Sequence, residues 1–317
     1  MTNDPKTSSW NEFRAEFVRH WVALPDKALF FGLLAAWVVL FELLGNPALG
    51  YVHTASLFRW LAFVYRTVPD DEHGFIIPAV VLILFWQKRK ELAAVPKSNW
   101  WPALILLLGA VAAHVLFYIV QQPKGSTIAF LLGLYALMGL VWGPAWLRAS
   151  FFPFILFVFC VPLGAIASDI TFNLRMLVTK LSVAISNGVL GLHVVRDGSR
   201  IFDSQYTFQY EVAPACSGIR SLISLGALSI IYAFVYFRSG WRRLLLIASC
   251  IPLAIAGNVS RLLIMIMVAS AWGQSAGEKI ESNLGFLTFA VSGACLLVIG
   301  RLIKEGKGGA STGLNRE

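Results

Sequence analysis

The sequence is poor in charge: only 14% of its 317 residues are Asp, Glu, Lys or Arg, whereas 57% are apolar. Soluble domains carry about 25% charged and about 45–50% apolar residues. A soluble chain of this length would not cover its surface with so few charges. The composition therefore excludes a soluble globular protein, and a disordered chain as well.

Metal and cofactor signatures are also missing. The four cysteines are too few and too widely spread for a disulfide framework or a zinc site. We find no glycine-rich phosphate loop, no Gly-x-Ser-x-Gly elbow and no carboxylate dyad in the sequence. We therefore predict neither a metal site nor a cofactor.

Long apolar runs are what the sequence has instead. A helix needs about 20 apolar residues to cross a hydrocarbon core of roughly 30 Å. The runs predict an all-α integral membrane protein with about eight transmembrane helices, at 28–45, 74–87, 100–120, 127–146, 150–168, 217–237, 244–271 and 284–302. No cleavage pattern follows the first run, which indicates an uncleaved first helix and not a signal peptide.

The basic residues indicate the orientation. With the N-terminus in the cytoplasm, the inner segments carry sixteen Lys and Arg residues and the outer segments eight, while Arg220 and Arg261 lie within spans. Basic residues collect on the cytoplasmic side of membranes. We predict a cytoplasmic segment over 1–27, one membrane domain over 28–303 and a disordered cytoplasmic tail over 304–317. The net charge of +9 is then a topology signal; we expect contact with membrane lipid and no nucleic-acid partner.

Two outer segments are too long to be simple turns. Residues 46–73 contain a mixed apolar and basic stretch that suits an interfacial helix. Residues 169–215 begin with an amphipathic stretch over about 170–190. A small β-hairpin follows, with the Asp-Gly dipeptide at 197–198 as its turn, and then an alternating polar and apolar strand that leads to Cys216.

Cys216 stands at the outer start of the sixth predicted span. A helix N-terminus and Arg220, four residues later on the same face, would both lower the pKa of the thiol and favour the nucleophilic thiolate. Free N–H groups in the first helical turn would stabilise a developing oxyanion. The pattern also fits a structural cysteine at a helix end, with Arg220 in a polar stripe that faces a neighbouring helix.

Arg261 is an unusual residue within an apolar run. It lies seventeen residues after Leu244, about 26 Å along the helix, which places it near the outer edge of the membrane. Ionisable residues within spans are costly and usually face a bundle interior or a functional cavity. Asn258 shares its helical face and would orient the guanidinium. The alternative is an arginine that extends to the outer interface.

Two titratable residues complete a set at the outer interface. Glu281 precedes Leu284, the first residue of the last span, and would serve as a general acid or base or simply as a solvated loop carboxylate. His73 marks the outer start of the second span, where a lone histidine is usually structural. A thiolate, a guanidinium and a titratable group at one level would suffice for acyl transfer at a peptide bond just outside the membrane.

The motif ACSGIRSL at 215–222, followed by NVSR at 258–261, resembles the exosortase/archaeosortase family. The segment HGF at 73–75 and the pair Gly285 and Phe289 in the last span fit the same family. The resemblance covers most of the chain from about residue 70 to 300.

This resemblance implies a multi-spanning cysteine transpeptidase or protease in the bacterial cytoplasmic membrane. Its partners would be exported proteins whose C-terminal sorting signal, of the PEP-CTERM type, joins a Pro-Glu-Pro-like motif, a transmembrane helix and a basic cluster. Cys216 would be the nucleophile and Arg261 would stabilise the oxyanion or the thiolate. The family's third catalytic residue is a His four residues before the glycine of the last span, and here that position holds Glu281.

This departure leaves several interpretations open. The chemistry is altered, another group such as His73 supplies the proton, or the chain binds sorting helices without cutting them. An anion transporter that uses Arg220 and Arg261 is a further alternative. It predicts matching broken helices in the two halves of the chain, and the sequence shows no such pairing. Arg220, Asn258 and His73 are predicted to support catalysis or bind the substrate.

Overall fold

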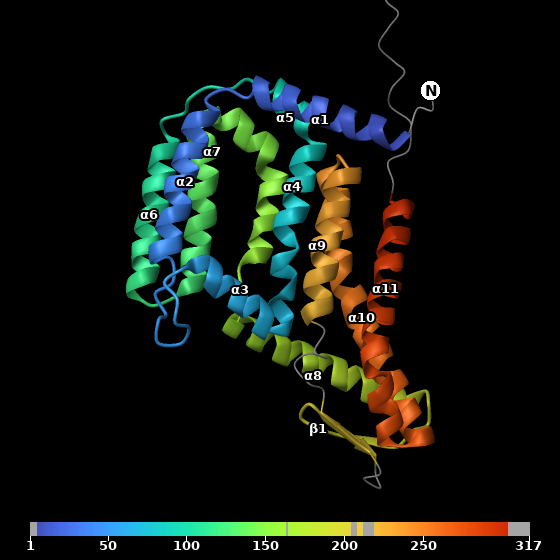
Figure 1. Cartoon of the computed structure of the whole chain (residues 1–317). Coiled ribbons are helices and arrows are strands. Elements are labelled where there is room, and N and C mark those ends of the chain that lie inside the picture. The colour runs from blue at the N-terminus through green and yellow to red at the C-terminus, as the bar shows by residue number, and fades with distance from the viewer. Residues whose placement is uncertain (1–4, 163, 204–207, 212–218, 304–317) are drawn as a thin grey trace, which may run out of the picture. The chain divides into compact units, whose positions relative to one another are not determined.

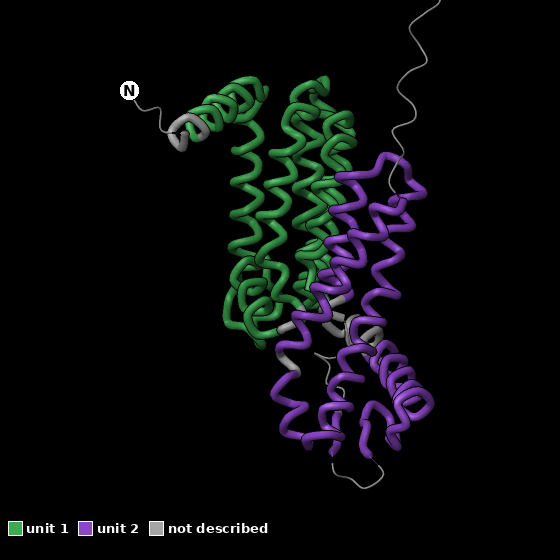
Figure 2. Tube along the Cα trace, turned by 90° about the vertical axis from the view of Figure 1, so that its right-hand side faces the viewer, with its two compact units in different colours: residues 1–162 green, residues 163–317 purple. Residues whose placement is uncertain are grey.

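Residues 5–162, 164–203, 208–211 and 219–303 are described by a computed structural model of the chain. They form helices and one small sheet, which divide into two compact units, residues 1–162 and residues 163–317 (Figure 2). Each unit is described by itself. Cys216 and the predicted disordered tail lie outside the described residues, and the single membrane domain stays a prediction.

The predicted all-α membrane fold is confirmed. In the part of the chain that the structure describes, four segments are long and apolar enough to cross a membrane: α2 (Lys27–Leu44), Pro123–Cys160, α10 (Gly240–Trp272) and Asn283–Leu302 within α11 (Gln274–Leu302). Shorter apolar helical segments in the same residues are α4 (Ile77–Gln87), α6 (Ala103–Ile119) and Leu222–Tyr236 within α9 (Ile219–Tyr236). Every predicted span has a helical counterpart, because Pro123–Cys160 contains two of them.

Unit 1 is a helical bundle with one further helix across each end. Its remaining elements are α1 (Pro5–Ala23), α3 (Leu57–Thr67), the 3-10 helix η1 (Pro69–Phe75), α5 (Arg89–Ala94), α7 (Pro123–Ile155) and the 3-10 helix η2 (Leu156–Cys160). In Figure 1, α2, α6 and the first part of α7 run side by side, α1 lies across one end and α3 lies at the other. Buried aromatic side chains such as Trp37, Phe41 and Trp142 fill the core between these helices.

Helix α7 consists of two legs that meet at Gly143. Its φ of 89° and ψ of 175° suit glycine, and Pro144 follows directly. A Cβ at Gly143 would come within 2.7 Å of the Ser98 carbonyl oxygen. The two legs lie side by side, since the Tyr135 hydroxyl donates to the Leu147 carbonyl at 2.8 Å. This reversal separates the predicted fourth and fifth spans, a few residues earlier than predicted.

The prediction of a continuous helix over 150–168 was wrong at its C-terminal end. After η2, Val161 adopts an extended conformation (φ −81°, ψ 116°), as expected of a residue that precedes a proline, here Pro162. Helix α8 (Gly164–Gly188) then begins unit 2, six residues before the predicted start of the amphipathic stretch.

The amphipathic helix predicted within 46–73 is confirmed as α3, and its place on the outer side of the membrane stays a prediction. Ser56 caps it, because its hydroxyl accepts the Arg59 N–H at 3.1 Å. Leu57 and Trp60 are buried, whereas Arg59 and Arg66 are exposed, so the helix is amphipathic.

Unit 2 carries the predicted hairpin as part of a three-stranded antiparallel sheet. Strands β1 (Val194–Asp197), β2 (Arg200–Asp203) and β3 (Gln209–Glu211) lie in that order. Asp197 pairs with Arg200, so the turn residues are Gly198 and Ser199, one position later than predicted. Gly198 has a φ of 60°, which favours glycine at this turn position.

Helix α10 connects two parts of the core of unit 2. Its first half packs against α9 and α11 around Leu246, Cys250 and Leu296. Its second half packs against α8 and the sheet, through residues such as Val178, Ile201 and Ile266. Arg261 lies near the beginning of this second half, two residues after the buried Val259.

Candidate active site

The structure describes the side chains of only some of the predicted site residues. Side chains are described for Arg261, Asn258 and His73. Glu281 and Arg220 lie within α11 and α9, but only their backbone is described, and Cys216 lies outside the described residues.

The Arg261 guanidinium lies against the backbone of α11 at Gly285. An ideal Cβ at Gly285 would be 3.6 Å from Nη1 and 3.8 Å from Cζ of Arg261. Arg261 is partly buried. A neighbouring helix borders its charged end, which favours the bundle-facing interpretation of this arginine.

Glu281 belongs to a helix, which corrects its predicted place in a loop. Gly273, with a φ of 86° and a ψ of 167°, is the single residue between α10 and α11, so α11 begins at Gln274. Glu281 precedes Gly285 by four residues, about one helical turn. The backbone of residue 281 therefore lies one turn from the glycine that borders Arg261.

Asn258 lies in the buried interior beside this position. It is 5% exposed, and its Nδ2 donates to the Ala254 carbonyl of its own helix at 2.7 Å. At the preceding residue, Gly257, a Cβ would come within 2.7 Å of the Ser292 Oγ. Helices α10 and α11 thus approach closely one turn before Arg261, as small residues allow in membrane proteins.

Tyr210 fastens the strand before the predicted nucleophile to the start of α11. Its hydroxyl donates to the Gln274 carbonyl at 2.9 Å and occupies the space beside Gly277. Cys216 follows Tyr210 by six residues, which span at most about 20 Å when extended. The anchored strand therefore limits the distance between Cys216 and the first turn of α11.

This contact was missed from the sequence. The alternation of polar and apolar residues predicts the strand that contains Tyr210, but no signal in it predicts the helix that the strand contacts.

His73 lies in unit 1, in η1, and is partly buried. Its carbonyl accepts the Ile76 N–H at 3.0 Å at the junction with α4. The next residue, Gly74, packs against the ring of Tyr65, whose hydroxyl donates to the Cys160 carbonyl. This packing fixes the backbone around His73; the role of its imidazole in the site stays a prediction.

The chemistry of the described part is cationic. The guanidinium keeps its charge at any physiological pH and offers five N–H donors, which suits it to stabilise a thiolate or an oxyanion. Within the described ranges, no group of three or more His, Cys, Asp or Glu side chains is placed to hold a metal ion.

Comparison with known proteins gives one match. A family profile described as transmembrane exosortase matches residues 60–298, three quarters of the chain, and the match includes Cys216, Arg261 and Glu281. No curated protein and no solved structure matches the chain significantly.

Proposed function

Since the chain belongs to the transmembrane exosortase family, we propose that it is a membrane cysteine transpeptidase or protease. Its substrates are exported proteins with a C-terminal sorting signal of the PEP-CTERM type. The chain cleaves these signals at the outer face of the bacterial cytoplasmic membrane.

The observation that carries this proposal is the place of the Arg261 guanidinium. It borders α11 at Gly285, one turn after Glu281. A permanent positive charge that is partly withdrawn from water is what a thiolate or a tetrahedral oxyanion needs beside it. The Tyr210 anchor supports the proposal only as an upper bound, because six residues of chain keep Cys216 within about 20 Å of the residue that contacts α11.

In the proposed reaction the Cys216 thiolate attacks the carbonyl carbon of the scissile peptide bond. The negative charge moves to the carbonyl oxygen, where Arg261 and N–H groups near Cys216 stabilise it. The C–N bond then breaks, and the leaving amine takes up a proton. A thioester remains on Cys216 until water or an acceptor amine attacks it and releases the thiolate.

Glu281 has a different role from the imidazole that the family carries at this position. A carboxylate near a guanidinium stays ionised at neutral pH and does not donate a proton to a leaving amine. We assign to Glu281 the orientation of Arg261 or of a water molecule.

Site-directed variants, co-expressed with a candidate substrate, test the proposal. Cys216→Ser and Arg261→Ala each abolish processing, while both proteins still insert into the membrane. Cys295→Ser replaces an exposed cysteine of α11 and serves as the matched control. Mass spectrometry of the substrate's C-terminus is the readout, and normal processing by Cys216→Ala would overturn the proposal.

Glu281 is tested separately. We expect a partial loss of processing in Glu281→Gln and a gain in Glu281→His, which restores the imidazole of the family. Unchanged rates in both variants would remove Glu281 from the site.

The replacement of the family's histidine favours one second candidate, a member that binds sorting helices without cutting them. Thioester trapping separates the two functions. A covalent adduct between Cys216 and the N-terminal part of the substrate supports cleavage, and a stable complex without an adduct supports binding alone.

A further inference from the structure

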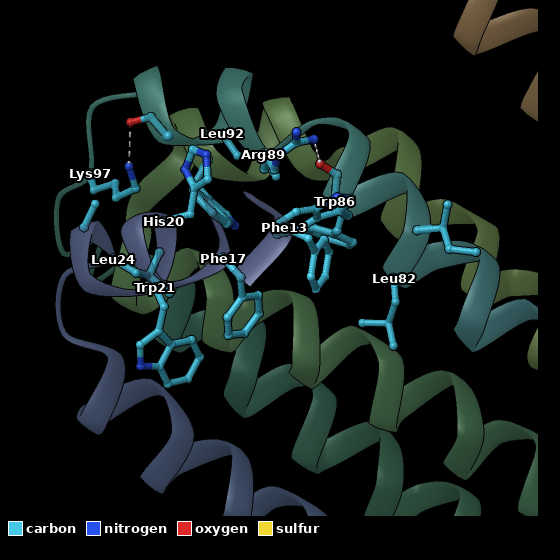
Figure 3. Close-up of a pocket in the computed structure, with 15 residues that line it drawn as sticks. Phe13, Phe17, His20, Trp21, Leu24, Leu82, Trp86, Arg89, Leu92 and Lys97 are labelled. Carbon is cyan, nitrogen blue, oxygen red and sulfur yellow. Dashed lines mark hydrogen bonds between the residues drawn. The ribbon is translucent and has the colours of Figure 1, made fainter. Parts of the chain in front are cut away.

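Unit 1 contains a cavity beneath α1, and none of the residues of the proposed active site is among those that line it. Its volume is about 580 Å³, within the range of ligand pockets. Phe13, Phe17 and Trp21 of α1 line it together with Leu82 and Trp86 of α4 (Figure 3). The lining is predominantly apolar, so the cavity suits a hydrocarbon chain.

The aromatic side chains of α1 indicate that the cavity lies at a membrane surface. Trp10, Phe13, Phe17 and Trp21 are spaced by three or four residues and stack on one another along one helical face. Each is more than 40% exposed. Such a stripe is typical of a helix that lies in the interface with its aromatic face at the start of the acyl chains.

A lysine and a histidine stand at one side of this apolar cavity. His20 and Lys97 lie on that side, and the rings of Trp21 and Phe17 point away from them (Figure 3). Arg89 also lines the cavity, but it is engaged: it pairs with Glu16 at 2.8 Å and donates to the Trp86 carbonyl at 2.9 Å.

Lys97 has one N–H donor beyond the two hydrogen bonds that it makes within the described residues. Its Nζ donates to the carbonyls of Ala93 and Val95, at 3.0 and 3.2 Å, and lies 5.5 Å from the centre of the Trp146 ring. An ammonium has three N–H donors. Among the residues that the structure describes, no carboxylate lies within ion-pair distance of Lys97. Burial lowers the pKa of this ammonium, an effect that a bound anion would offset.

The surroundings of the cavity are basic as well. Residues 10–27 and 88–100 contain seven Lys and Arg residues against four Asp and Glu residues. In the predicted orientation this end of unit 1 faces the cytoplasm, where anionic lipids attract basic segments. An apolar cavity with cations on one side is complementary to an amphiphile with an anionic head.

We propose that the cavity binds one anionic phospholipid, with an acyl chain beneath α1 and the phosphate at Lys97. The site is independent of peptide cleavage. The bound lipid would hold α1 against α4 at the cytoplasmic surface.

Two matched pairs of variants test the proposal on the full-length protein. Ala93 lines the cavity and Ala94 does not, although both are exposed in α5, so Ala93→Trp fills the cavity and Ala94→Trp is its control. Lys97→Gln removes the charge but keeps N–H donors for the carbonyls, and the control Lys90→Gln removes an exposed charge of α5.

The probes are phosphatidylglycerol and phosphatidylcholine with identical acyl chains, and native mass spectrometry counts the bound lipid. We expect one phosphatidylglycerol on the wild type and a preference over phosphatidylcholine that falls roughly fivefold in Lys97→Gln but not in Lys90→Gln. Ala93→Trp loses both lipids and Ala94→Trp keeps them.

Equal retention of the two lipids by the wild type, or equal retention by Ala93→Trp and Ala94→Trp, would overturn the proposal. If Ala93→Trp does not fold, the lysine pair decides, because neither glutamine changes the packing of the cavity walls. An unchanged preference in Lys97→Gln then counts against the site.

Discussion

At the scale of single residues, Arg261 and Gly285 together define the described part of the site. The sequence predicts the importance of Arg261 because an ionisable side chain within an apolar run requires a protein environment. The role of Gly285 becomes visible only in three dimensions, where the glycine leaves room for the guanidinium. Cys216 is predicted from its motif and its place before a helix, and its geometry lies outside the described residues.

Two substitutions of Gly285 test this packing. Alanine places its Cβ 3.6 Å from Nη1 of Arg261, an ordinary contact, so we expect processing within about twofold of the wild type. Leucine would extend into the volume of the guanidinium and displace it, and we expect a loss of at least about tenfold, equal to about 1.4 kcal/mol. Rates of substrate processing are the measurement, with thermal unfolding as the control for folding. Equal rates in the two variants would mean that Arg261 does not act from this position.

At the scale of elements, short connections and glycines position the parts of unit 2. Gly273 alone joins α10 to α11, so α11 begins at Gln274 and already contains Glu281. The apolar pattern predicts the start of this helix only at residue 284. The turn at Gly143 was likewise not predicted from the sequence. Hydrophobicity predicts two spans, but the residue at which the chain turns depends on its φ and ψ angles. The sequence predicts residues 1–27 only as a cytoplasmic segment and not as helix α1, because the aromatic stripe of α1 is mixed with basic residues.

The anchor between β3 and α11 is tested at Gly277. Alanine there would collide with the Tyr210 hydroxyl and break its bond to the Gln274 carbonyl. At an ordinary position within a helix, replacing glycine by alanine stabilises the helix by up to about 1 kcal/mol. A loss of stability in Gly277→Ala would therefore indicate the collision with Tyr210. We expect faster hydrogen exchange across β3 and about tenfold slower processing.

Gly293→Ala in the same helix is the control, since its nearest neighbour would be 3.8 Å away. Protection of β3 that is the same in both variants would contradict the anchor.

The contact between α1 and α5 predicts a dependence on pH. The hydrogen bond from Arg89 lowers the pKa of the Glu16 carboxyl, and the charges of Arg89, Lys90 and His20 act in the same direction against its desolvation. A carboxyl whose pKa is lower in the folded state stabilises the contact at neutral pH, and this contribution is lost as the pH falls through that lowered pKa. We therefore expect hydrogen exchange in residues 5–23 to accelerate below about pH 4.

Glu16→Gln removes the titrating group, so its exchange in α1 is fast already at neutral pH and changes little on acidification. An acid-induced acceleration of the same size in this variant would assign the effect to another residue.

At the scale of the whole molecule, the family match covers residues from both units. The profile begins in α3, includes η1 with His73, and ends in α11 beyond Gly285. The residues that carry the resemblance are therefore distributed over a helical framework, and their function depends on the side of the membrane that they face. The lengths of the apolar runs predict the helices of this framework well. The contacts between elements that are distant in the sequence could be identified only from the structure.

The length of α10 links the orientation of the chain to the position of Arg261. Arg261 follows Gly240, the first residue of α10, by 21 residues, which corresponds to about 32 Å along the helix. This distance is close to the thickness of the hydrocarbon core, so we expect Arg261 and the connection at 237–239 to lie at opposite membrane surfaces. With a cytoplasmic N-terminus, we expect the basic connection inside and Arg261 outside.

Reporter fusions test this orientation. Alkaline phosphatase is active only outside the cytoplasm, so we expect activity when it follows residue 203 in the sheet of unit 2. We expect none when it follows residue 238, between α9 and α10. A fluorescent protein that matures only in the cytoplasm should give the inverse pattern, and should also fluoresce when fused to either terminus. If phosphatase is active at 238 and inactive at 203, Arg261 faces the cytoplasm, and a site for exported proteins is excluded there, because its substrates would arrive at the other surface.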